Sequence, residues 1–163
     1  MTEAATEYYL TGLRNQHAVE KQAISTIEGQ LSRMEPYPEL HARMQKDLER
    51  SRTQAERLDT LMAKQNTGVS AVKEAVTSAV GAVSSAVHVS ASDEVVKNVL
   101  AAVGFKAYEI ASYKALIATA EIAGRTEDTA LLQQSMSEEQ EMGDWLGENL
   151  PGIVQSYLRQ ARD

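Results

Sequence analysis

The sequence predicts an all-α protein, a four-helix bundle with a long helical crossover between helices two and three and a short C-terminal helix, in a single domain over residues 1–163. Ala, Glu, Gln, Leu, Lys, Arg and Met are plentiful, while proline occurs three times and aromatic residues make up 5%, a composition that favours helices. Apolar residues recur at three- and four-residue steps along four long segments. The connections between these segments are short, long and short, the order of a bundle with one crossover.

The first helix is predicted by a stripe of mostly apolar residues within the first 31 positions. The stripe comprises Leu10, Leu13, His17, Glu20, Ile24, Ile27 and Leu31. The segment RMEPYPEL ends this helix, because each proline disfavours helical geometry in the residue before it, and Pro38 can then open the next helix. The tight turn predicts that helices one and two are antiparallel neighbours.

The second helix is predicted over residues 39–65, and the segment NTG that follows is a typical helix stop. Arg52 interrupts the apolar stripe of this helix between Leu48 and Ala55. The stripe comprises Leu40, Met44, Leu48, Ala55, Leu58 and Met62.

Residues 69–92 have a different composition, with small residues and valines at helical spacing. This pattern predicts the crossover helix, packed across the bundle. A membrane-surface helix is the alternative, but the polar face carries Lys73 and Glu74 rather than a basic stripe.

The third helix is expected from a cap at Ser92 or Asp93 to Ile122, and the fourth from a cap at Thr126 or Asp128. The inward stripe of the third helix includes Val95, Val99, Val103, Ile110, Tyr113 and Ile117, with Lys106 on the stripe and Glu109 at its edge. The segment ENLPGI is expected to break the fourth helix, which leaves a short terminal helix over residues 153–159.

Charge and cysteine content argue against several classes of protein. The 23 acidic residues outnumber the 16 basic ones, so the chain would repel a phosphate backbone and no nucleic acid is expected as a partner. Without cysteine there is no disulfide, thiolate metal site or cysteine nucleophile. The first residues lack the pattern of a signal peptide, and no stretch reaches the roughly 20 apolar residues of a membrane span, so we expect a cytoplasmic protein that does not bind membranes.

Each of the four helices interrupts its apolar stripe near mid-length. The interrupting residues are Glu20, Glu49, Arg52, Lys106, Glu109, Glu138 and Glu139. Buried carboxylates are costly unless a metal, a proton or a cation neutralises them. Di-metal bundle proteins use a Glu on each of two helices and a Glu-x-x-His on each of the other two. The sequence therefore predicts a carboxylate centre in the middle of a ferritin-like bundle.

Four segments carry a resemblance to a known family: HAVEKQA at 17–23, LERSRTQAERLDTL at 48–61, AYEIASY at 107–113 and LLQQSMSEE at 131–139. They resemble the YciE/YciF family of bacterial ferritin-like proteins over nearly the whole chain. The resemblance implies a four-helix bundle that forms a homodimer, a link with bacterial stress responses and a di-metal centre. Carried over position by position, it implies the metal ligands Glu20, Glu49, Glu109, Glu138 and Glu139.

The chain departs from the family pattern at three ligand positions. Arg52 stands where helix two should have its His, Lys106 replaces the first Glu before IASY, and Gly143 replaces an Asp. Arg52 and Lys106 cannot ligate a cation while protonated, but each brings positive charge to the carboxylates. We therefore expect that these two residues replace the charge of the metal and that no cofactor is bound. The alternatives are a single weak metal site and a two-metal iron or manganese centre, and both basic side chains are also long enough to point out of the bundle.

Three further residues are auxiliary candidates. His17 lies one turn before Glu20 and is the best spare ligand, while Tyr108 and Tyr113 are candidates for redox chemistry; such residues are more often structural. No other enzyme signature is recognisable. The expected function is non-catalytic, a stress-associated structural or partner-binding role with an unidentified protein partner. The alternative is a ferritin-like di-iron or di-manganese oxidoreductase or metal-binding protein.

Overall fold

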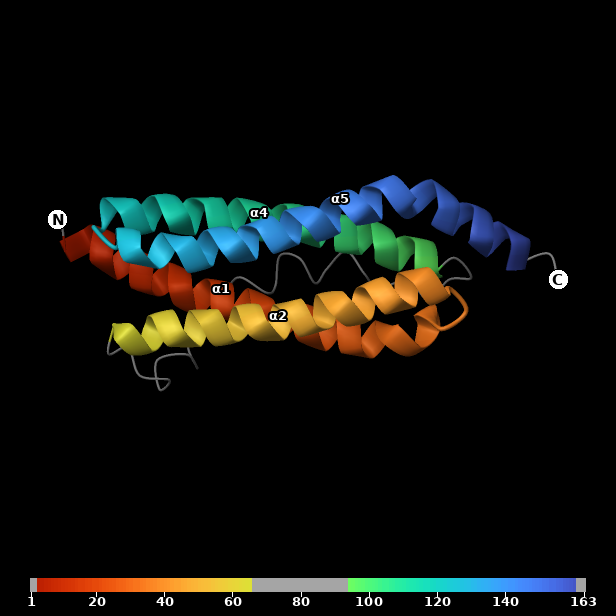
Figure 1. Cartoon of the computed structure of the whole chain (residues 1–163), viewed down its shortest axis with the longest axis horizontal. Helices are drawn as coiled ribbons and strands as arrows, with labels where there is room; N and C mark the ends of the chain where they lie inside the picture. The colour runs from red at the N-terminus through yellow and green to blue at the C-terminus, as the bar shows by residue number, and fades with distance from the viewer. Residues whose placement is uncertain (1–2, 66–93, 161–163) are drawn as a thin grey trace.

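The computed structural model describes residues 3–65 and 94–160, which are helical apart from short turns. Four long helices lie alongside one another in an elongated bundle (Figure 1). They are α1 (Glu3–Gln30), α2 (Pro38–Lys64), α4 (Glu94–Ile122) and α5 (Thr129–Gln160), with the short 3-10 helices η1 (Leu31–Met34) and η3 (Thr126–Asp128) at two of their ends. The prediction of an all-α protein with four long helices is confirmed.

The two short connections form for identifiable local reasons. Pro38 is the first residue of α2, as the sequence predicts, because its fixed φ suits the first turn, where no N–H donor is needed. At the end of α4, Gly124 adopts a φ of 70°, which an L side chain rarely tolerates. The amide of Arg125 then donates to the carbonyl of Ala120 and that of Gly124 to Glu121, which closes the helix as a Schellman motif. Each closure turns the chain back, so α1 with α2 and α4 with α5 are antiparallel pairs.

Two apolar clusters fill the two halves of the bundle and fix the directions of the helices. The first cluster joins the start of α1, the ends of α2 and α4, and the start of α5: Tyr9, Leu13, Leu58, Leu61, Met62, Tyr113, Leu116, Ala120, Ala123 and Leu132. The second joins the opposite ends of the same helices: Ile27, Met34, Leu40, Met44, Leu48, Val95, Val99, Met142, Leu146 and Ile153. Helices α2 and α4 therefore run in the same direction, and the end of α2 and the start of α4 lie at opposite ends of the bundle (Figure 1). The predicted crossover helix over 69–92 lies outside the described residues.

The prediction of a break at ENLPGI and a separate terminal helix is wrong. Helix α5 continues through Pro151 to Gln160 and bends along its length (Figure 1). A proline costs a helix one N–H donor, but its φ is helical. The side-chain amide of Asn149 donates to the carbonyl of Trp145 at 2.8 Å just before the proline, and Ile153 is buried in the second apolar cluster just after it. The apolar packing beyond the proline therefore keeps the last turns attached to the bundle.

None of the described helices combines the length and the apolar character needed to cross a bilayer.

Candidate functional site: a buried carboxylate centre

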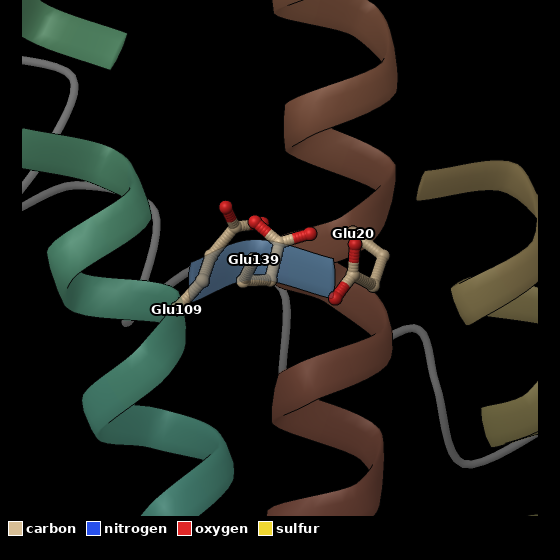
Figure 2. A group of neighbouring side chains, drawn as sticks. All are labelled: Glu20, Glu109 and Glu139. Carbon is tan, nitrogen blue, oxygen red and sulfur yellow. The ribbon is translucent and has the colours of Figure 1, made fainter. Parts of the chain in front are cut away.

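A layer of polar side chains separates the two apolar clusters at mid-length. Glu20 of α1, Glu109 of α4 and Glu139 of α5 are each fully buried there. One carboxylate oxygen of each lies within 4.8 Å of the others, and the three side chains converge from their separate helices (Figure 2). Each Glu lies on the inward face of its helix, because buried apolar residues occupy the same face one turn before or after it.

The ammonium of Lys106 lies among these carboxylates. Lys106 Nζ donates a hydrogen bond to Glu139 Oε2 at 2.5 Å and lies 3.0 Å from Glu109 Oε2. It is also 3.1 Å from Asp47 Oδ2, an oxygen of a residue on α2 that is 1% exposed. Lys106 itself is 3% exposed, so its charge points into the bundle and not into solvent.

Glu20 is held by neutral hydrogen-bond donors. Tyr113 donates its hydroxyl to Glu20 Oε1 at 2.6 Å, and Gln16 Nε2 donates to the same oxygen at 3.1 Å. Ser112 donates in turn to Gln16 Oε1 at 2.5 Å, which orients the amide. These contacts leave Glu20 Oε2 buried and without a hydrogen-bond partner among the described residues.

Among the described residues the layer contains four buried carboxyl groups and one buried ammonium, so protons are needed for part of the neutralisation. Burial raises the pKa of Glu20 to about 7, with a further rise from the charge of Glu139. Burial likewise raises the pKa of Asp47, and it raises that of Glu109 well above its usual range although Lys106 opposes this. Burial disfavours the charged Lys106, but Glu109, Asp47 and Glu139 outweigh it and hold the lysine pKa well above its ordinary value. The lysine is therefore charged, and the raised pKa values of Glu20, Asp47 and Glu109 favour protons on these carboxyl groups.

The donor set suits one hard cation better than it suits a two-metal centre. Oxygens of Glu20, Glu109 and Glu139 lack hydrogen-bond partners among the described residues, and carboxylates are the ligands that manganese, magnesium and calcium prefer. The Lys106 ammonium, however, lies against Glu109 and Glu139, which a metal would also need. Within residues 3–65 and 94–160, the group of possible ligands also contains no imidazole, which the two-metal pattern requires. Glu20, Glu109 and Glu139 would therefore hold at most a single ion, in competition with the lysine.

The expected contribution of helix two to the centre is corrected by the structure. Arg52 bonds to Glu49 at 2.5 Å and to Glu28 at 2.7 Å on the outside of the bundle. The side chains of Arg52 and Glu49 are 46% and 68% exposed. Neither residue reaches the buried carboxylates. Of the two residues predicted to replace metal charge, Lys106 lies in the centre and Arg52 does not. The physical reason is helical phase, since Ser51, one residue before Arg52, takes the inward position.

Glu138 and Glu139 are adjacent in sequence but separate in space. Arg57 Nη1 and Nη2 donate to the two oxygens of Glu138 at 2.7 and 2.9 Å, and Gln54 Nε2 adds a bond of 3.0 Å. Burial disfavours the charged Glu138, yet Arg57 and Gln54 outweigh it and lower its pKa. Glu138 therefore forms a half-buried ion pair that links α5 to α2, and it does not belong to the buried group of three glutamates.

The auxiliary candidates also separate. Tyr113 contacts the centre, but Tyr108 is 40% exposed and packs its ring against Phe105 on the outside of α4. His17 is buried, and its Nε2 lies 3.1 Å from Asp59 Oδ1 on α2. We assign His17 to the α1–α2 contact, because its partner is an exposed carboxylate and not a glutamate of the centre.

Asp47 is the residue of the centre that the sequence interpretation missed. Residues Asp47, Ser51 and Gln54 form a buried polar stripe at three- and four-residue steps, directly beside the apolar stripe of Leu48 and Ala55. The signal was present in this spacing. The buried face of α2 is two positions wide, so its apolar members alone do not indicate that the neighbouring polar stripe is buried as well.

A four-helix bundle with glutamates from three helices converging at mid-length has the arrangement on which carboxylate metal sites of four-helix bundles are built. The chain belongs to the family described as a domain of unknown function, DUF892, whose model matches residues 4–159. This confirms the resemblance to the YciE/YciF family, since the solved Escherichia coli stress protein YciF shares the fold: it is 20% identical, with 94% of this chain and 99% of that chain covered and a TM-score of 0.74.

Two other solved structures are similar to this chain. A protein from Xanthomonas campestris pv. campestris is 28% identical, with 98% of this chain and 99% of that chain covered and a TM-score of 0.81. YcfI from Rhodopseudomonas palustris is 24% identical, with 90% and 94% covered and a TM-score of 0.70. The fold thus extends over nearly the whole length of each chain.

Proposed function

We propose that this protein is a non-catalytic member of the family, in which Lys106 supplies the positive charge that metal ions supply in ferritin-type centres. The observation that carries the proposal is the position of the Lys106 ammonium, within 3.1 Å of oxygens from Asp47, Glu109 and Glu139. A charged lysine cannot act as a metal ligand, and it repels a cation from the carboxylates it contacts. The role that remains for such a bundle is structural or partner-binding. The likeness to the stress protein YciF supports a stress-associated role.

The proposal is tested by the metal content of protein purified without an affinity tag, followed by anaerobic titration with ferrous iron and with manganese. We expect less than one tightly held metal ion per chain and no consumption of dioxygen or peroxide. Two tightly bound ions per chain would refute the proposal, because Lys106 would then have to leave the carboxylates. Glu138→Gln is the matched control, since it removes a carboxylate that lies outside the centre.

A second function has one observation in its favour. The unpartnered oxygens of Glu20, Glu109 and Glu139 within 4.8 Å of one another form a donor set for iron or manganese. A bound ion would supply redox chemistry with dioxygen or peroxide, and the protein would then be a ferritin-like oxidoreductase. Metal occupancy together with peroxide-dependent oxidation of the ion would favour this alternative.

We also propose that the protein is a homodimer that pairs through the outer face of α4. The residues of this face are uncharged, exposed and spaced three or four positions apart: Leu100, Gly104, Tyr108, Ala111, Ala115, Ala118 and Ile122. A helix that is apolar on both its inner and its outer face is normally covered on both. Because the face is small-residue-rich along its middle, a second copy of the same helix can approach it closely.

A further inference from the structure

Three arginines of α2 bind acidic residues of α5 across the middle of the bundle. Arg43, Arg50 and Arg57 follow one another at seven-residue intervals, close to two turns, so they lie on one face of α2 about 10 Å apart. Arg43 and Arg50 donate to the two oxygens of Glu141, at 2.8 and 2.5 Å. Arg57 donates to both oxygens of Glu138. We call these five residues the α2–α5 ion-pair row.

The pairs of this row are ionic at neutral pH and accessible to dissolved ions. Hydrogen bonds from Arg50 and Arg43 lower the pKa of Glu141 to about 2. Burial raises the pKa of Glu138, but the bond from Arg57 outweighs it, and the pKa is lowered. The arginine side chains are 15–18% exposed and that of Glu141 is 50% exposed. Salt therefore screens these pairs, since the Debye length falls from about 10 Å at 0.1 M to about 3 Å at 1 M.

Polar groups, and not apolar packing, lie directly behind the row. Gln54 is fully buried, and its Nε2 donates to Glu138 at 3.0 Å and to the carbonyl of Ser135 at 3.4 Å. Arg57 donates to Ser135 Oγ at 3.1 Å, and Ser135 is 1% exposed. Ser135 lies one turn before the buried Glu139 on α5. At mid-length the contact between α2 and α5 is thus held by hydrogen bonds and ion pairs, between the two apolar clusters.

Helices α1 and α4 meet on the opposite side of the bundle, and their contact is of another kind. Gly12 allows a close approach, because a Cβ atom there would lie 2.9 Å from Leu116 Cδ1. Ser112 and Gln16 join the two helices by a hydrogen bond between uncharged groups. Neither of these contacts is an ion pair, so salt does not screen them.

We infer that the α2–α5 ion-pair row is a salt-sensitive gate, along which the bundle opens locally and admits water to the buried polar layer. Screening weakens the row, whereas the apolar clusters and the α1–α4 contact keep the rest of the bundle together. Local openings of this kind occur where few buried apolar contacts hold two elements. The inference goes beyond the proposed function, because the gate would act whichever cation neutralises the buried carboxylates.

The chain contains no cysteine, so a single engineered thiol can report the opening. Ser135→Cys places a thiol directly behind the row, and Ala120→Cys places one at a buried position of α4 within the first apolar cluster. The probe is N-ethylmaleimide, which is uncharged and is therefore not screened by salt. Between about 0.05 M and about 1 M NaCl we expect the modification rate of Ser135→Cys to rise about tenfold or more. That of Ala120→Cys should rise by less than about twofold, because its burial does not depend on ion pairs.

The role of the ion pairs is tested by adding Glu138→Gln and Glu141→Gln to the Ser135→Cys chain. The three arginines then lack their partners, so we expect modification at low salt to be about tenfold or more faster and to rise no further with salt. Arg52→Met is the matched control, because it removes an ion pair on the outside of α1 and α2. It should leave the modification rate and its salt dependence unchanged.

Each outcome decides the inference. A modification rate of Ser135→Cys that does not change with salt would overturn it. An equal rise for Ala120→Cys would do so as well, because the whole bundle would then be unfolding. Removal of the two glutamate charges without faster modification at low salt would also contradict it. If Ser135→Cys does not fold, Ser51→Cys, at a fully buried position of α2, takes its place with the same expectations.

Discussion

Tyr113 donates its hydroxyl to Glu20 Oε1 at 2.6 Å, and both side chains are completely buried between α4 and α1. Burial raises the pKa of Tyr113, and the neighbouring Glu20 raises it further, so the hydroxyl keeps its proton and remains a donor. The same bond lowers the pKa of Glu20, but the larger effect of burial leaves it at about 7. Glu20 therefore titrates near neutral pH in the folded protein.

Stability should depend on pH through Glu20. Its pKa is about 7 in the folded protein against a reference value of 4.5, so between these values the folded chain holds a proton that the unfolded chain releases. The resulting stabilisation is full below about pH 4.5, is lost as the pH rises to about 7, and changes no further above it. Glu20→Gln removes this titration and keeps an acceptor for Tyr113. Between pH 5 and 7.5 we expect the wild type to lose a few kcal/mol of unfolding free energy more than Glu20→Gln does. Parallel pH profiles from urea unfolding would contradict this assignment.

The ion pairs that Arg57 and Arg52 form on α2 should differ in their contribution to stability. Arg57 and Glu138 share two hydrogen bonds, and their side chains are only 15% and 19% exposed, whereas the Arg52 side chain is 46% exposed. We expect Arg57→Met to cost about 1.5–3 kcal/mol, because it leaves a half-buried carboxylate without its main donor. Arg52→Met, the matched control, should cost less than about 1 kcal/mol. Equal losses of unfolding free energy in the two variants, measured by urea unfolding, would show that burial does not make the Arg57 ion pair the stronger one.

Gly12 marks a close approach between α1 and α4. A Cβ atom at this position would lie 2.9 Å from Leu116 Cδ1, and Leu116 is buried. Gly12→Ala should therefore destabilise the protein by about 1–3 kcal/mol through overpacking. Gly29→Ala on the same helix meets nothing within 4 Å and should be neutral or stabilising by a few tenths of a kcal/mol. A stabilised Gly12→Ala variant would show that Leu116 moves aside freely.

The proposed dimer face can be tested by placing a charge at its middle. Ala111 is exposed on α4, so Ala111→Glu should leave the monomer folded but bury a carboxylate in the interface. We expect the mass measured by light scattering to fall from dimer to monomer. Thr53→Glu, at an exposed position of α2, is the control and should leave the mass unchanged. An unchanged mass for Ala111→Glu, or a monomeric wild type, would refute this interface.

Periodicity and turn chemistry were sufficient to predict most of the fold. The proline turn before α2 and the long inward stripes predict the four helices, because these features depend on local geometry alone. The continuity of α5 through Pro151 could not be predicted in this way. It depends on Ile153, whose burial against other helices holds the turns after the proline in place.

The buried residues of the site could be predicted on helices that bury about one residue per turn, because the spacing then shows which residues point inward. Glu20, Lys106 and Glu109 lie on narrow inward stripes, and the structure brings them together. On α2 both Asp47 and Leu48 are buried, so the spacing from Leu48 predicts an inward Arg52, whereas the spacing from Asp47 selects Ser51 and leaves Arg52 outside. A shift of one residue rotates a helical position by more than a quarter of a turn. Only the contacts between helices decide which of two neighbouring stripes points inward, and these contacts cannot be read directly from the sequence.

The neutralising role of Lys106 is tested most directly by comparing Lys106→Met with Lys114→Met, an exposed lysine about two turns further along α4. Urea unfolding at pH 7.5 should show a loss of about 3–5 kcal/mol for Lys106→Met, because buried carboxylates lose their cation, and almost none for Lys114→Met. At pH 5 the loss should shrink, since burial raises the pKa values of Glu20, Asp47 and Glu109 and protons then replace the lysine. A Lys106→Met variant as stable as Lys114→Met at pH 7.5 would contradict the account.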